Sequence, residues 1–160
     1  MSRSNIKFNS PKNDTAPILK IQNIFANDQH RLRVSFNFSF ITTNNDFNLN
    51  GTNFTGEKAK LLFDRISFLS QFDVKDAIAK GKKHGLELIK SFSNKDKISK
   101  LDIHSAFGED RVDLCNDGYW IFRLCPNNNP YESRILGKMI DHTFYVMFID
   151  CEHELYAKRK

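Results

Sequence analysis

The chain has 160 residues, a length that provides one domain with one hydrophobic core and leaves little room for a second. Its net charge of +5 and pI of about 9.1 favour an anionic partner such as nucleic acid, although part of the excess lies in the last three residues, 158–160. The longest apolar run, residues 144–149, is too short to cross a bilayer, which argues against a membrane protein.

Residues 1–16 are predicted to form a flexible arm in front of a single domain, residues 17–160. The arm is rich in Ser, Asn and Lys, is interrupted by Pro11, and has no hydrophobic period. It also lacks the apolar stretch of a secretory leader, so we expect a cytoplasmic protein.

The first predicted strand covers residues 32–40, where apolar side chains occupy the even positions and polar ones the odd positions. This period of two indicates a half-buried antiparallel strand. Residues 44–46 then supply a turn, and Phe47 and Leu49 are expected to begin a return strand before Gly51.

Two helices are predicted next. Thr55 is suited to the N-cap of the first, in which Leu62, Ile66 and Leu69 recur at helical spacing. Asp73 is suited to the N-cap of a second, short helix that ends near Gly81 or Gly85. Residues 86–92 fit either a strand or a helix. Residues 93–110 indicate a long loop with one short element at 98–103, and so long a connection is either functional or mobile.

Three more strands are predicted at residues 119–125, 134–140 and 143–149, and the last two are joined by the tight turn Asp141-His142. The final strand is apolar on both faces, with even positions on one and odd positions on the other, which is typical of a central strand covered by helices. The predicted fold is therefore α+β: a mostly antiparallel sheet with helices packed on one face and a C-terminal β-meander.

The cysteines and metal-ligand residues give no sign of a cofactor. Cys115, Cys125 and Cys151 are odd in number and form no C-x-x-C pair, so we expect buried, reduced thiols. A metal site built from Asp150, Cys151 and His153 would lack a second ligand cluster. No metal and no cofactor are predicted.

Two groups of side chains are candidates for chemistry. His153 and Tyr156 follow the last strand and are candidate proton-transfer residues, although an ordinary polar C-terminus would look the same. Four cations that lie on the meander or just before it are candidates for binding phosphate, namely Arg111, Arg123, Arg134 and Lys138. The alternative for them is a solvated sheet face.

The C-terminal 40 or so residues resemble the closing meander of RelE-type bacterial toxins, small basic ribonucleases that cut mRNA on the ribosome. The runs that carry the resemblance are 120–124, 134–137, 144–150 and 153–156. The resemblance implies that Arg123 and Arg134 hold phosphate and that His153 or Tyr156 is the terminal acid or base. The same tail is also similar to uncharacterised proteins of bacterial mobile elements.

Two functions follow as hypotheses. The first is an RNA-directed toxin or metal-independent ribonuclease that uses the 2′-hydroxyl as nucleophile, with RNA or the ribosome and an antitoxin as partners. The second is a non-catalytic module that binds nucleic acid or a protein, such as a phage-defence or anti-defence protein. The sequence does not set the oligomeric state. Both hypotheses of function require the arginines and the His153/Tyr156 pair to face one open groove.

Overall fold

The computed structural model describes residues 32–158, and the predicted arm and the predicted start of the domain at residue 17 lie outside that range. Within it the predicted α+β fold is confirmed. One five-stranded sheet has the order β1-β5-β4-β3-β2, with all neighbours antiparallel except β1 and β5. The strands are β1 (Ser35–Asn37), β2 (Glu87–Ile89), β3 (Tyr119–Arg123), β4 (Arg134–Ile140) and β5 (Thr143–Asp150).

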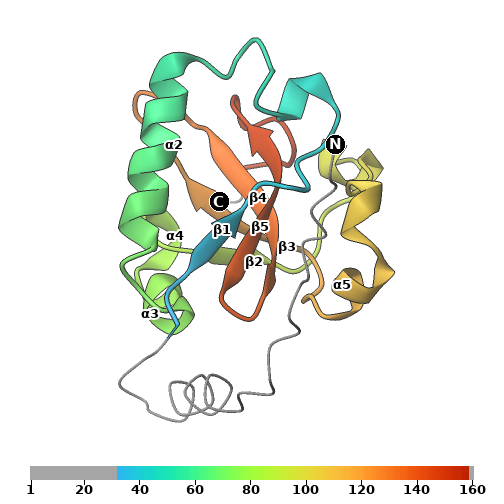
Figure 1. The fold of residues 1–160 in the computed structure, drawn as a ribbon. Coiled ribbons are helices and arrows are strands. Elements are labelled where there is room, and N and C mark those ends of the chain that lie inside the picture. Colours follow the sequence, from blue (N-terminus) through green and yellow to red (C-terminus); the bar gives the residue numbers. More distant parts are fainter. Residues whose placement is uncertain (1–31, 159–160) are drawn as a thin grey trace, which may run out of the picture. The chain divides into compact units, whose positions relative to one another are not determined.

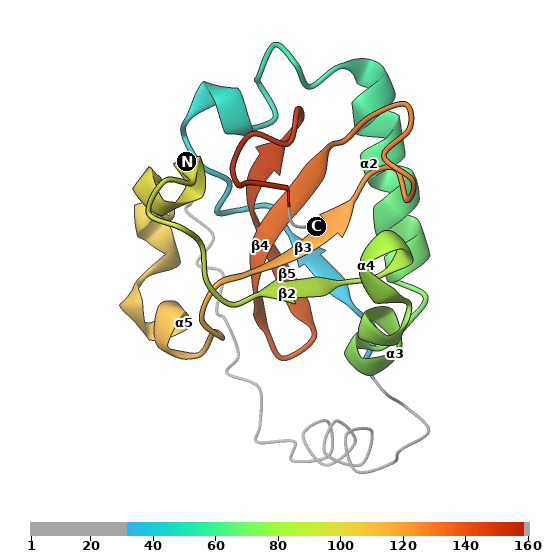
Figure 2. The same cartoon turned by 180° about the vertical axis from the view of Figure 1, so that it is seen from behind.

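The two faces of this sheet have different covers (Figure 1). On one side lie α2 (Gly56–Leu69), α3 (Val74–Ala79) and α4 (Gly81–His84). On the other side lies the segment of residues 93–114, which ends in α5 (Glu109–Asp113), as the view from behind also shows (Figure 2). Short 3₁₀ turns complete this second cover: η2 (Asn45–Phe47), η3 (Lys97–Lys100) and η4 (Ser105–Phe107).

Both predicted helices begin where their caps were expected, although the second ends at Ala79 and is followed by the separate α4. The Thr55 side chain accepts from the Lys58 backbone N–H at the start of α2, and the Asp73 side chain accepts from Asp76 at the start of α3. Leu62 and Leu69 are buried in the core, as the helical spacing predicted. Residues 87–89 of the ambiguous stretch form a strand.

The first strand differs from its prediction in length and direction. It runs parallel to β5. It has only three residues because the chain turns after Asn37, whose side chain accepts from the Ser39 N–H at 2.9 Å. Phe36 then packs on Phe144 on one face of the sheet, whereas Phe40 packs on Phe107 on the other. The alternating pattern thus marks a chain that crosses the sheet edge.

The expected return strand at Phe47 is also wrong. Asn44 caps a 3₁₀ turn by accepting from the Asp46 N–H at 2.9 Å. Phe47 is buried from that turn in the core that lies between the sheet and the segment of residues 93–114. Leu49 is 45% exposed. An Asn-rich stretch is compatible with either a capped turn or the start of a strand. Here the hydrogen bond that the Asn44 side chain accepts from the backbone stabilises the turn.

The 93–110 loop is a packed cover. Ile98 and Phe107 are fully buried against the sheet, in the same cluster as Leu136 and Phe148. The Ile98 N–H donates to the Leu155 carbonyl at 2.9 Å. The loop therefore holds the chain that follows β5.

A β-bulge in β5 changes which side chains face which cover. Leu136 pairs with Phe148 but Gly137 pairs with Val146, so Met147 is an extra residue. Phe148 therefore joins Tyr145 and Met147 in one core cluster and Ile149 joins Phe144 and Val146 in the other, which corrects the predicted strict alternation. Beyond the bulge, Asp150 lies on the loop-covered face, opposite Arg134.

Gly137 leaves the space that the Phe144 ring fills. A Cβ at this position would lie 2.4 Å from a ring carbon of Phe144 and 2.3 Å from the Tyr145 carbonyl oxygen. We expect Gly137→Ala to lower the free energy of unfolding by about 1–3 kcal/mol because the core cannot take up the extra methyl group. Urea denaturation tests this, with Gly56→Ala as control because nothing lies within 4 Å of its added Cβ. Equal midpoints for the two variants would contradict the packing argument.

Candidate functional site

A pocket of about 210 Å³ lies on the loop-covered face, where β3 ends and β4 begins. It brings together four of the six predicted site residues, namely Arg123, Arg134, His153 and Tyr156. The remaining lining residues were not singled out as site residues from the sequence: Lys82, Glu87, Ile89, Asn128 and Lys158.

The two arginines meet because of the register between their strands. Arg123, the last residue of β3, is the direct cross-strand partner of Arg134, the first residue of β4. Such partners have Cβ atoms about 5 Å apart and project from the same face, and like charges in this position are destabilising. The sheet therefore holds two guanidinium groups side by side at the pocket.

Asn128, in the loop between these strands, bridges the pair. Its side-chain oxygen accepts from Arg134 Nη2 at 2.7 Å and from Arg123 Nη1 at 3.4 Å. Arg134 Nη1 donates to the Glu132 and Ser133 carbonyls at 2.8 and 3.2 Å, and its side chain is almost fully buried. These contacts fix the orientation of the guanidinium planes without adding a negative charge.

No carboxylate of residues 32–158 forms an ion pair with either guanidinium. Asp150 lies opposite Arg134, but its two oxygens accept from the Glu154 and Leu155 N–H groups at 2.8 and 2.9 Å. Glu132 pairs instead with Lys158 at 2.5 Å. Burial, with a smaller contribution from Arg123, lowers the pKa of Arg134. The pocket is thus a desolvated cationic site that an anion would stabilise.

His153 enters the pocket from a left-handed backbone position with φ of 56°. Its two ring nitrogens are buried and have no hydrogen-bond partner among the described residues. Burial, and then the charge of Arg134, lowers the pKa of His153 to about 4. The imidazole is therefore neutral at pH 7 and has one nitrogen that accepts a proton or hydrogen bond.

Tyr156 lies against His153, with ring centroids 4.7 Å apart. Burial raises the pKa of Tyr156, against an opposing effect of the nearby Arg134 guanidinium. The phenol is therefore protonated at pH 7. The pocket accordingly offers a neutral proton acceptor and a proton donor beside two fixed positive charges.

Lys138 and Arg111 lie outside this pocket. Lys138 is on the same face of β4 as Arg134, as predicted, but four residues further along, which is about 13 Å. Its Nζ donates to the Gly118 carbonyl at 2.5 Å and lies over the Tyr119 ring. Arg111 donates to the Phe107 carbonyl at 2.9 Å and stacks on Phe40. Neither side chain can reach an anion held between Arg123 and Arg134.

The lining residues that were not predicted come from helix α4, from edge strand β2, from the loop between β3 and β4, and from the segment after β5. Asn128 lies in an Asn-rich run before a proline and has a φ of 58°, a position that asparagine tolerates well. Lys82 lies in the basic run 80–84, and this run is a signal for a charged surface near a site. Glu87 is the one carboxylate among the lining residues, and nothing in its local sequence marks it.

The cysteines, the possible metal ligands and the helices of residues 32–158 also bear on the predictions. The three cysteines are free thiols, and burial raises the pKa of Cys151 to about 11. No group of three His, Cys, Asp or Glu side chains within this range is arranged to hold a metal ion. None of the helices there has both the length and the apolar character needed to span a bilayer.

Comparison with known proteins gives no matching family model, no matching curated protein and no matching solved structure. The resemblance of the C-terminal residues to RelE-type toxins therefore stays a prediction. The pocket itself carries the functional argument.

Proposed function

We propose that this protein binds RNA through a backbone phosphate held between Arg123 and Arg134 and cleaves the chain there without a metal ion. The observation that carries the proposal is the directly opposed pair of Arg134, which is buried, and Arg123, which is partly buried, with no carboxylate partner among the described residues. A phosphate oxygen pair matches two guanidinium groups in both charge and hydrogen-bond geometry.

The adjacent side chains suit cleavage by the neighbouring 2′-hydroxyl. Neutral His153 would take the proton from that hydroxyl as its oxygen attacks phosphorus. Protonated Tyr156 would give its proton to the departing 5′-oxygen as the P–O bond breaks. The arginines would stabilise the charge that develops on the phosphoryl oxygens. The products would be a 2′,3′-cyclic phosphate and a 5′-hydroxyl end.

A protein of this kind would be toxic when expressed without a partner that covers the pocket. The proposal therefore includes a toxin role, with the ribosome or free mRNA as target and an antitoxin as regulator. It is supported by the four pocket residues that coincide with those implied by the resemblance to RelE-type toxins: Arg123, Arg134, His153 and Tyr156.

The test combines growth and cleavage. Expression of the wild type is expected to arrest growth, and the double variant His153→Leu, Tyr156→Phe is expected to abolish arrest. Purified protein with EDTA should cleave an RNA oligonucleotide, and a single 2′-deoxy substitution should block the bond next to it. Lys138→Met is the control, since Lys138 lies outside the pocket. Absence of both toxicity and cleavage in the wild type would remove the proposal.

One observation favours a second function, binding without cleavage. A histidine whose pKa is about 4 is a weak base, so the same pocket would hold phosphate well and catalyse poorly. Salt-sensitive RNA binding that depends on Arg123 and Arg134, with no cleavage product, would select this alternative. A stable protein partner with no affinity for RNA would select a protein-binding module instead.

A further inference from the structure

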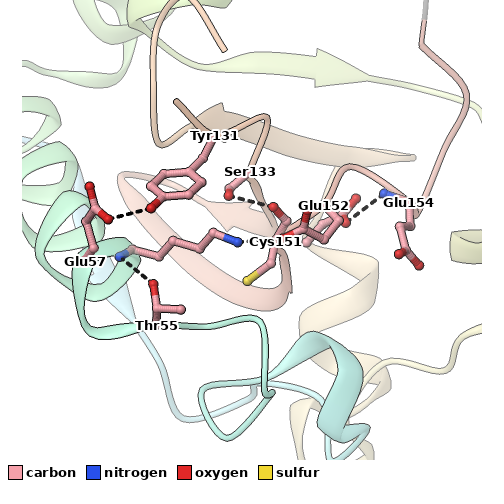
Figure 3. A network of polar contacts seen from close by, with 9 residues as sticks. Thr55, Glu57, Tyr131, Ser133, Cys151, Glu152 and Glu154 are labelled. Carbon is pink, nitrogen blue, oxygen red and sulfur yellow. Dashed lines mark hydrogen bonds and ion pairs between the residues drawn. The ribbon is translucent and has the colours of Figure 1, made fainter. Parts of the chain in front are cut away.

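The segment that follows β5, residues 151–158, is anchored to the rest of the domain at several positions. The Cys151 carbonyl accepts from Ser133 Oγ at 2.7 Å, and Glu152 pairs with the buried Lys58 of α2 at 2.6 Å (Figure 3). Glu154 pairs with Lys97 at 2.5 Å. The His153 and Tyr156 side chains instead line the pocket.

Asp150 is the inner anchor of this segment. It is fully buried, and its two carboxylate oxygens accept from the Glu154 and Leu155 N–H groups. Its position follows from the bulge in β5, which brings it to the pocket face of the sheet. By binding the two N–H groups that follow His153, it closes the chain into the turn that gives His153 its left-handed backbone.

Asp96 is the outer anchor and comes from the long loop. One of its oxygens accepts from the Ala157 N–H at 2.9 Å, and the other accepts from the Ser93 N–H at 2.8 Å. Two residues further on, the Ile98 N–H donates to the Leu155 carbonyl. The contacts at Leu155 and Ala157 thus hold the backbone on both sides of Tyr156.

We infer that Asp150 and Asp96 are positioning residues that hold His153 and Tyr156 in fixed orientation beside the arginine pair. The inference rests on the proposed function and assigns to the 93–110 loop the task of aligning the proton-transfer pair. The arginines belong to the sheet and do not depend on this segment for their register. Loss of either aspartate should therefore disturb proton transfer much more than phosphate binding.

The first measurement follows the His153 ring by proton NMR, with the signal assigned by its loss in His153→Gln. In the wild type the pKa should be near 4. In Asp96→Ala it should move upward toward about 6.5, because a loosened ring gains water. Asp102→Ala is the matched control, since Asp102 is an exposed aspartate of the same loop, and it should leave the pKa unchanged.

The second measurement separates catalysis from binding. Asp96→Ala and Asp150→Asn should lower kcat for RNA cleavage by about 10-fold to 100-fold, while KM and the affinity for inorganic phosphate change by less than about threefold. Asp96→Asn keeps one acceptor oxygen and should recover much of the loss. Thermal denaturation checks that each variant is folded. Asp96 lies in the loop and not in the sheet, so the Asp96 variants still test the inference if Asp150→Asn fails to fold.

Two results would overturn the inference: a His153 pKa in Asp96→Ala equal to that of Asp102→Ala, or equal losses in phosphate affinity and kcat. If the wild type binds phosphate but cleaves no RNA, the cleavage proposal fails on its own. The NMR titration and the phosphate titration then still decide whether Asp96 positions the pair.

Discussion

Replacing Arg123 and Arg134 together with methionine is expected to lower the affinity for inorganic phosphate and for RNA by about 10²-fold to 10⁴-fold. Each guanidinium would contribute charge-assisted hydrogen bonds of about 1.5–3 kcal/mol, and a difference of 1.4 kcal/mol is tenfold in affinity. Isothermal titration with phosphate and a salt series with single-stranded RNA measure the loss. The slope of log affinity against log salt should also become shallower.

The control for this experiment uses a cation of the same strand. Lys138→Met is expected to leave phosphate affinity unchanged, because Lys138 bonds to the Gly118 carbonyl and not to the pocket. It should lower stability instead, since the partly buried Gly118 carbonyl loses its donor. A phosphate affinity that survives in the double arginine variant, or falls equally in Lys138→Met, would contradict the assignment of the pocket.

The arginine pair should also have a characteristic effect on folding stability. The Arg123 side chain makes only long hydrogen bonds of 3.4 Å within the described domain and lies directly opposite another cation. Arg123→Met should therefore leave the free energy of unfolding unchanged or raise it by up to about 1 kcal/mol. Proteins accept locally unfavourable residues mainly at functional sites, so a pocket residue that does not stabilise the fold is consistent with a role in binding.

The elements with a clear local signal were predictable from the sequence. The helix starts at Thr55 and Asp73 have a cap that needs no tertiary contact, and the turn Asp141-His142 separates two runs of strand-like residues. The fold class followed from the order of these elements. The candidate site was partly predictable as well, because His153 and Tyr156 follow a strand end that faces the arginines.

The remainder depended on contacts that a sequence does not contain. The bulge at Met147 reverses the face of every later residue in β5, so Asp150 could not be placed by counting positions. Arg123 faces Arg134 only because the loop between their strands sets that register. Lys138 lies on the same face of β4 as Arg134, as predicted, but it is four residues further along the strand and therefore lies outside the pocket.

The pH dependence of cleavage is the prediction that tests His153 most directly. The base must be neutral, and its pKa in the free protein is lowered to about 4, so kcat/KM should rise with pH through about 4 and then stay level. At pH 5 about 90% of the wild-type activity should remain, whereas a histidine with a pKa of 6.5 would retain about 3%. Tyr156 must be protonated, and its raised pKa places the alkaline loss above pH 10.

The same lowered pKa makes stability depend on pH in a definite direction. Between about pH 4 and 6.5 the unfolded chain binds a proton at His153 that the folded protein does not, so stability is lost as pH falls through this window. A shift of this size corresponds to about 3 kcal/mol, and partial solvent exposure of the ring reduces the expected loss to about 1–2 kcal/mol.

Urea denaturation at pH 7 and pH 4.5 measures the loss, which His153→Gln should remove. Added phosphate should reduce it, because a bound anion favours the protonated ring. A wild type and a His153→Gln variant with the same pH dependence would mean that the imidazole is solvated. In that case its protonation would no longer be coupled to the arginine pair, and the basis for assigning it the role of base would be lost.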